Sequence, residues 1–104
     1  MTSDEVRALI EREIAGDWAR SNLHGCDLRR CMVDPAQREY DDSFNPPNVV
    51  ELWLVLEEIP ETRDGYKIVF SAERGVFGLA VPGFTRRDVL IGYYGTFLET
   101  YDAM

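Results

Sequence analysis

The chain has 104 residues, of which 45% are apolar, and a formal net charge of −8 at pH 7. A chain of this length can bury one modest core, so we expect a single domain over residues 1–104 with a stability of about 5–10 kcal/mol. The acidic charge argues against nucleic-acid binding, because it repels phosphate backbones. No run approaches the roughly 18 apolar residues of a membrane span, and the acidic, periodic N-terminus is unlike a signal peptide. We therefore expect no membrane association and a cytoplasmic location.

The first expected element is an amphipathic helix at the N-terminus. Thr2 or Ser3 can cap it, and the acidic residues that follow suit the positive end of a helix dipole. Its apolar residues recur at spacings of three and four and are Val6, Leu9, Ile10, Ile14 and Trp18. We expect this helix to reach Arg20 or Ser21 despite the internal Gly16.

Residues 22–48 predict no regular element and are interpreted as an irregular middle segment. Cys31-Met32-Val33 suits either a short strand or the end of a second helix. Asp34-Pro35 is typical of a helix start or a turn, and Asn45-Pro46-Pro47-Asn48 indicates extended chain leading into the next strand.

Three strands are expected next, over residues 49–59, 66–70 and 76–81. The first is apolar at every position from Leu52 to Leu56, which is typical of a strand covered on both faces. Asp64-Gly65 signals a turn, and Ala72 to Gly75 fits a short hairpin loop in which glycine takes a positive φ. Short connections favour an antiparallel meander.

A second helix is expected after the strands. Thr85 and Asp88 resemble a capping box, with Phe84 and Val89 placed as a hydrophobic staple. Apolar residues from Val89 to Tyr101 cover an arc of roughly 200° on a helical wheel. The predicted fold class is therefore α+β: an N-terminal helix, an irregular middle segment, a three-stranded antiparallel β-meander and a C-terminal helix packed on the sheet.

In such a meander the strand over residues 49–59 would lie at an edge of the sheet. An apolar edge strand needs cover, either from residues of the middle segment or from the same strand of a second molecule. We favour cover by residues 30–44 of the same chain, because that segment is long for a mere connection. The expected state is a monomer rather than a symmetric dimer.

No motif in the chain points to catalysis, a metal or a cofactor. His24, Cys26 and Cys31 lack a clear fourth ligand and the spacing of a zinc site, and we interpret the cysteines as reduced thiols. Glu57 and Glu58 are adjacent on a strand, so their side chains point to opposite faces. The glycines form no phosphate-binding motif, and the acidic run at residues 41–45 lacks the spacing of an EF-hand.

The acidic charge is concentrated in one part of the chain. Residues 34–104 hold thirteen carboxylates against six basic residues. Within a predicted loop, Tyr40, Asp41, Asp42 and Phe44 combine carboxylates with aromatic contact area, a combination suited to binding a basic protein. The alternative for Tyr40 and Phe44 is that they plug the open end of the core.

The function predicted from these features is non-catalytic protein binding, as an inhibitor, an immunity-type protein or a regulatory subunit. Two alternatives stay open. One is a small enzyme or ligand-binding domain that uses a pocket between helix and sheet, lined by Trp53, Tyr93 or Tyr94. The other is a self-associating structural module.

Overall fold

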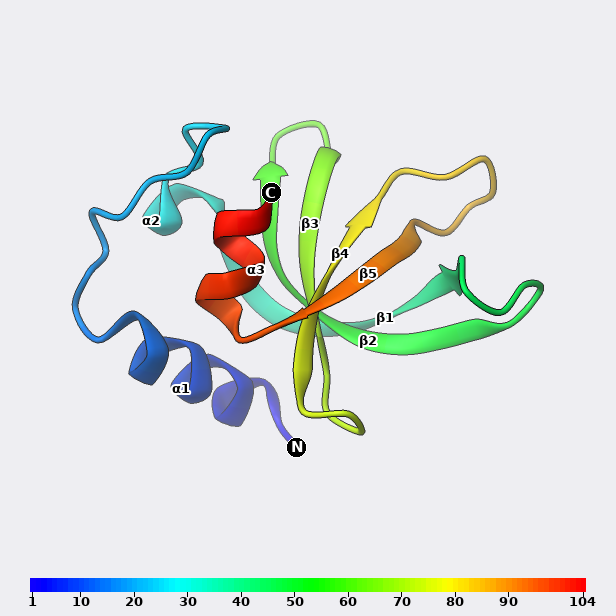
Figure 1. The fold of residues 1–104 in the computed structure, drawn as a ribbon, viewed down its shortest axis with the longest axis horizontal. Helices are drawn as coiled ribbons and strands as arrows, with labels where there is room; N and C mark the ends of the chain where they lie inside the picture. The colour runs from blue at the N-terminus through cyan, green and yellow to red at the C-terminus, as the bar shows by residue number, and fades with distance from the viewer.

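A computed structural model describes all 104 residues and shows five strands and three helices (Figure 1). In chain order the elements are α1 (Ser3–Ile14), α2 (Leu28–Cys31), β1 (Met32–Asp42), β2 (Val49–Ile59), β3 (Asp64–Ser71), β4 (Val76–Val81), β5 (Val89–Gly95) and α3 (Phe97–Ala103). The α+β class, the antiparallel sheet and a helix at each end are confirmed. The prediction of only three strands is wrong, because β1 and β5 complete the sheet.

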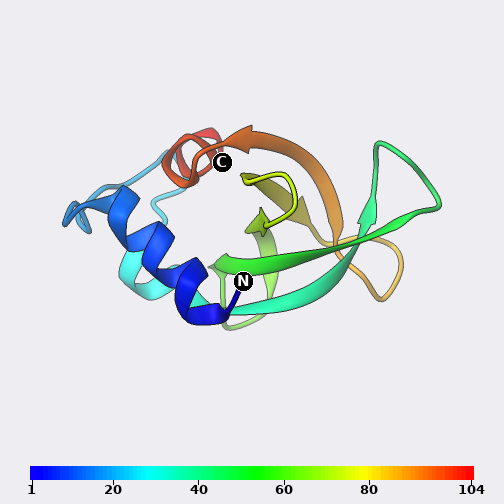
Figure 2. The same ribbon diagram turned by 90° about the horizontal axis from the view of Figure 1, so that it is seen from below.

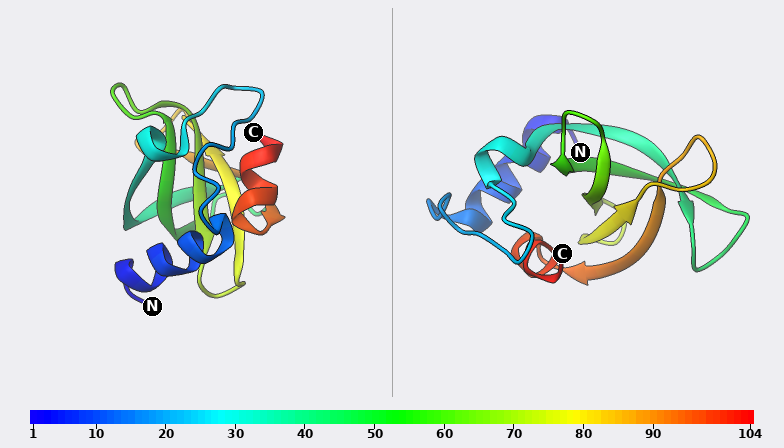
Figure 3. Two further views of the ribbon diagram at one scale, coloured as in Figure 1. Left: turned by 90° about the vertical axis from the view of Figure 1, so that its left-hand side faces the viewer. Right: turned by 90° about the horizontal axis from the view of Figure 1, so that it is seen from above.

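The five strands form a closed barrel. Each strand pairs antiparallel with the next, and a short parallel contact between β5 and β1 closes the ring, with Asp41 opposite Val89 and Asp42 opposite Leu90. The three helices gather at one end of the barrel, and the β1–β2 and β4–β5 loops project from the other (Figures 1 and 2). Figure 3 shows the same division from two further directions.

The middle segment contains a long strand that the sequence pattern concealed. Residues 32–42 of β1 pair with β2, with Arg38 opposite Leu52 and Tyr40 opposite Val50. Residues 32–41, within the predicted range 30–44, therefore cover the edge of β2 in the same chain. The prediction of an irregular segment was wrong because β1 lacks the alternation of apolar and polar residues that identifies a strand. Most of its exposed positions are charged, and it contains Pro35, where the register with β2 shifts.

The predicted helix starting at Thr85 is a strand at residues 89–95, followed by a short helix. Valine, isoleucine and two tyrosines favour a strand, and pairing with β4 stabilises it. A strand that is partly buried on both faces is apolar at almost every position. Plotted on a helical wheel, such a run covers a wide arc, which is why this segment resembled a helix. Gly95, with φ 106°, separates it from the helix. The capping box lies at Thr96 and Glu99 instead of Thr85 and Asp88.

Helix α1 begins as predicted and ends early. Thr2 accepts a hydrogen bond from the Glu5 amide, and the Glu5 carboxylate accepts one from the Thr2 amide, which completes a capping box. The helix ends at Ile14, not at Arg20, because the next residue is left-handed with φ 52° and Gly16 follows with φ 86°.

The remaining strand predictions hold closely, and the sheet is buried on both faces. β2 and β4 have the expected bounds, and Gly75 in the β3–β4 turn has φ 68°. On β3, Ile68 and Phe70 belong to the larger core cluster and Val69, between them, to the smaller one. Because alternate strand residues face opposite sides, both faces are covered, as the apolar run of β2 predicted.

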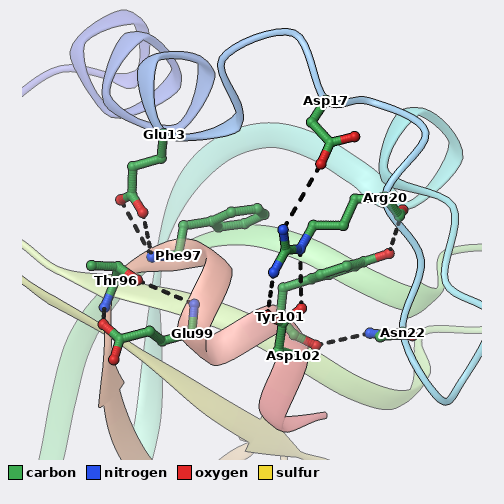
Figure 4. Close-up of polar contacts among 9 residues, drawn as sticks. All are labelled: Glu13, Asp17, Arg20, Asn22, Thr96, Phe97, Glu99, Tyr101 and Asp102. Atoms are coloured by element: carbon green, nitrogen blue, oxygen red, sulfur yellow. Dashed lines mark hydrogen bonds and ion pairs between the residues drawn. The ribbon is translucent and has the colours of Figure 1, made fainter.

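Polar contacts hold α3 against α1 and the long α1–α2 connection (Figure 4). The Glu13 carboxylate on α1 accepts a hydrogen bond from the Phe97 amide at 3.0 Å, at the N-terminus of α3. Arg20 forms a two-pronged ion pair with Asp102. The fully buried Tyr101 hydroxyl shares its hydrogen between the carbonyls of Arg20, at 3.0 Å, and Cys26. This one side chain therefore ties residues 20–26 to the barrel.

We predict that Tyr101→Phe destabilises the protein by about 1–2 kcal/mol, because two buried carbonyls lose their donor. Burial raises the pKa of Tyr101 to about 12, and the nearby thiols add to the effect. The Tyr101 hydroxyl therefore contributes its full stabilisation below the pKa of tyrosine in the unfolded chain, about 10. This stabilisation is lost as the pH rises through the higher pKa of the folded state. Urea denaturation should show that the variant loses less stability at alkaline pH than wild type does. Tyr94→Phe, at an exposed position, should change stability by less than about 0.5 kcal/mol.

Candidate functional site

The loop end of the barrel, residues 41–48 and 82–88, is the candidate functional site. Both loops project away from the helices (Figure 2). Hydrogen bonds join them: the Asp41 amide donates to the Asp88 carbonyl at 2.9 Å, and the Ser43 hydroxyl donates to the Leu90 carbonyl at 2.6 Å. Thr85 Oγ1 also donates to Asp41 Oδ2 at 2.7 Å. The two loops therefore form one surface, held by the closure of the barrel.

The four residues predicted for partner binding occupy different environments here. Tyr40, Asp41 and Asp42 end β1 rather than lying in a loop as predicted, because they pair with β2 and β5. Tyr40 is only 1% exposed and belongs to the smaller core cluster, which matches the alternative reading of this side chain as core. Phe44 is 65% exposed. The surface therefore contains Asp41, Asp42 and Phe44 but not the Tyr40 ring.

A groove of about 430 Å³, here called the acidic groove, runs between the two loops. Its lining residues are Asp41, Asp42, Ser43, Pro46, Pro47, Asn48 and Thr85. Asp41 lies 3.7 Å from the Arg87 guanidinium, which offsets part of its charge. Asp42 forms no ion pair and accepts a hydrogen bond from the Phe44 amide at 2.9 Å, so it carries the free negative charge of the groove.

An exposed aromatic side chain stands on each loop. Phe44 lies on the β1–β2 loop, and Phe84 on the β4–β5 loop is fully exposed. Sequence reasoning assigned Phe84 to a hydrophobic staple and so missed it as a surface residue. The neighbours of Phe84 indicate an exposed loop. It follows the turn-forming Pro82-Gly83 and precedes the polar run Thr85-Arg86-Arg87.

A second pocket, of about 530 Å³, lies beside the acidic groove where β1 meets the β4–β5 loop. We call it the arginine pocket; its lining residues are Gln37, Arg38, Glu39, Tyr40, Glu51, Arg63, Arg86, Arg87 and Asp88. Its four arginines come from β1, the β2–β3 loop and the β4–β5 loop. Sequence reasoning missed this concentration, because the barrel assembles it from residues far apart in the chain.

A buried polar network lies beneath the arginine pocket. Lys67 is only 2% exposed; its Nζ donates to the Arg63 carbonyl at 2.6 Å and lies 3.5 Å from Asp88 Oδ2. The buried Glu57 carboxylate lies 3.6 Å from Arg63 Nε. These pairs connect the β2–β3 loop to the start of β5, so they hold two walls of the pocket together.

His24 and the two cysteines have structural contacts of their own. His24 Nδ1 lies 2.8 Å from Glu58 Oε2. Burial opposes ionisation of Glu58, but hydrogen bonds from the Tyr66 amide and His24 outweigh it, so its pKa is lowered. Cys26 and Cys31 are free and buried, and burial raises the pKa of the Cys26 thiol. No three His, Cys, Asp or Glu side chains gather as a potential metal site.

No family model, curated protein or solved structure matches this chain. None of the three helices is long and apolar enough to cross a bilayer.

We predict that Asp88→Asn destabilises the protein by about 2 kcal/mol, because it leaves the buried Lys67 ammonium without its carboxylate. The double variant Lys67→Met/Asp88→Asn should recover most of that loss, since it removes both charges. The control is Glu61→Gln, which breaks the exposed pair with Arg30 and should cost less than about 0.5 kcal/mol. Denaturant titration measures all three. A double variant less stable than Asp88→Asn would contradict the pairing.

Proposed function

We propose that this protein is a non-catalytic binding domain of the cytoplasm that acts as a monomer and engages a basic protein partner through its loop end. An inhibitor, an immunity-type protein and a regulatory subunit all fit this description. The closed barrel supports the monomer, since β2 is covered by β1 and offers no free edge to a second molecule.

The observation that carries the proposal is the acidic groove flanked by Phe44 and Phe84. Exposed phenylalanines on joined loops offer rigid apolar contact area, and interfaces are enriched in such side chains. The groove between the loops supplies the Asp41 and Asp42 carboxylates at a concave surface. A lysine or arginine of a partner could enter the groove while the two rings contact the surrounding surface.

The geometry gives the carboxylates different roles. Asp41 is held by Thr85 and Arg87 and therefore fixes the shape of the groove. Asp42 has no basic neighbour within ion-pair distance, so its charge is available to steer a basic partner. Recognition then relies on a preformed surface, which limits the entropy lost on binding.

The alternative of a pocket between helix and sheet receives less support. The acidic groove and the arginine pocket contain no residue of α3, and neither is lined by Trp53, Tyr93 or Tyr94. Trp53 lies in the larger core cluster, where it packs with the helices.

The test is a pull-down with the purified protein as bait and mass spectrometry of the captured proteins. We expect a basic protein that wild type captures and that Phe44→Ser/Phe84→Ser does not, because the variant loses both apolar contacts. Leu23→Ser provides the control, since Leu23 is also a highly exposed apolar residue but lies in the α1–α2 connection. Capture by Phe44→Ser/Phe84→Ser at wild-type levels would place the interface elsewhere.

A second prediction concerns the association rate with that partner. Asp42→Asn should slow association several-fold at low salt, and the difference should shrink as salt rises, because exposed charges are screened beyond about 10 Å at 0.1 M. Surface plasmon resonance or stopped-flow fluorescence measures it. Glu73→Gln in the β3–β4 turn removes the same charge away from the loop end and should leave the rate unchanged. If both variants slow association equally, the effect comes from the net charge of the protein and not from the position of Asp42.

A further inference from the structure

The arginine pocket concentrates positive charge on an acidic protein. The chain has eleven basic residues against nineteen acidic ones, yet Arg38, Arg63, Arg86 and Arg87 all line this one pocket. Like charges brought together by folding cost energy unless something offsets them.

Two of the four arginines have no carboxylate partner. Arg63 is paired with Glu57 and Arg87 with Asp41, at 3.6 and 3.7 Å. Arg38 and Arg86 are exposed and form no ion pair within the protein. Both guanidiniums therefore keep their full complement of N–H donors for a ligand.

Three carboxylates also line the pocket, those of Glu39, Glu51 and Asp88. Neither Glu39 nor Glu51 forms an ion pair with an arginine of the pocket. The two are cross-strand neighbours on β1 and β2. The remaining carboxylate, Asp88, is engaged by Lys67.

A third donor comes from Tyr40, independently of the arginines. Its side chain is 1% exposed and lines the pocket, and its hydroxyl has no hydrogen-bond partner within the protein. A buried hydroxyl without a partner costs about 1–3 kcal/mol. Burial, and then the negative charge of Asp88, raise the pKa of this hydroxyl, so it stays protonated at neutral pH and can donate.

We propose that the arginine pocket binds a phosphate dianion, either free or as the monoester of a small molecule, through Arg38, Arg86 and the Tyr40 hydroxyl. Two guanidinium forks and a hydroxyl offer more donors than the two oxygens of a carboxylate can accept in good geometry. They match three terminal oxygens carrying close to two negative charges. A pocket of about 530 Å³ also leaves room for the organic part of a small ester.

This site is distinct from the proposed protein-binding surface. The acidic groove and the arginine pocket share no lining residue. A nucleic-acid polyanion is a poor candidate, because the net charge of −8 repels an extended phosphate backbone. A single small anion meets only the local field of the pocket.

The test is an NMR titration of the ¹⁵N-labelled protein at constant ionic strength and about pH 7.5, where a phosphate monoester is close to doubly charged. The probes are inorganic phosphate, phenyl phosphate and acetate. We expect saturable shifts at residues 38–40 and 86–88 with both phosphates, and binding of acetate at least about tenfold weaker. Tighter binding of phenyl phosphate than of inorganic phosphate would identify the ligand as a monoester. Equal affinity for the two would identify it as free phosphate.

Variants test the donors one at a time. Arg38→Met and Arg86→Met should each weaken phosphate binding about tenfold, whereas Arg12→Met, an exposed and unpaired arginine on α1, should not. Tyr40→Phe should weaken binding several-fold while its melting temperature equals or exceeds that of wild type, because the hydroxyl has no partner to lose. Non-saturable shifts, binding that survives Arg38→Met/Arg86→Met, or equal binding of acetate would overturn the proposal.

Discussion

The position of β1 between β2 and β5 is the constraint on which the rest of the structure depends. β1 pairs with β2 over most of its length and with β5 only at Asp41 and Asp42. That short parallel contact closes the barrel, and it also draws the β4–β5 loop against the end of β1. The acidic groove and the arginine pocket both arise at this junction, since each is lined by residues of β1 and of the β4–β5 loop.

The two ends of the barrel carry different kinds of interaction. At the helix end a sixteen-residue apolar cluster joins α1 and α3 to the strands, and Tyr101 fixes the long α1–α2 connection to it. The smaller cluster, of six residues, includes Tyr40 and Ala80, and Ala80 is the cross-strand neighbour of the buried Lys67, which pairs with the half-buried Asp88. Apolar burial near the helices can offset the cost of buried polar groups near the loops, and proteins commonly tolerate that cost at binding sites.

Net charge alone gives a misleading view of the loop end. The acidic half of the chain suggested a surface suited to a basic partner at residues 40–44, but an acidic groove and an arginine pocket lie next to each other there. Within the arginine pocket, ion pairs occupy Asp88 and Arg63, whereas Arg38 and Arg86 form none. The net charge of the molecule therefore does not say which charges are available at each pocket.

The sequence by itself determined the elements whose signals are local. The capping box at Thr2, the bounds of β2 and β4 and the turn at Gly75 depend on neighbouring residues, and all were predictable. The apolar run of β2 also required cover, which the chain provides. Only the tertiary structure decided β1 and β5, because neither shows the alternation that identifies a strand. β1 has charged residues at its outer positions, and β5 is apolar on both faces. It also decided both pockets. Arg38, Arg63 and Arg86 line one pocket because strand pairing brings distant segments together, and no spacing in the sequence indicates this.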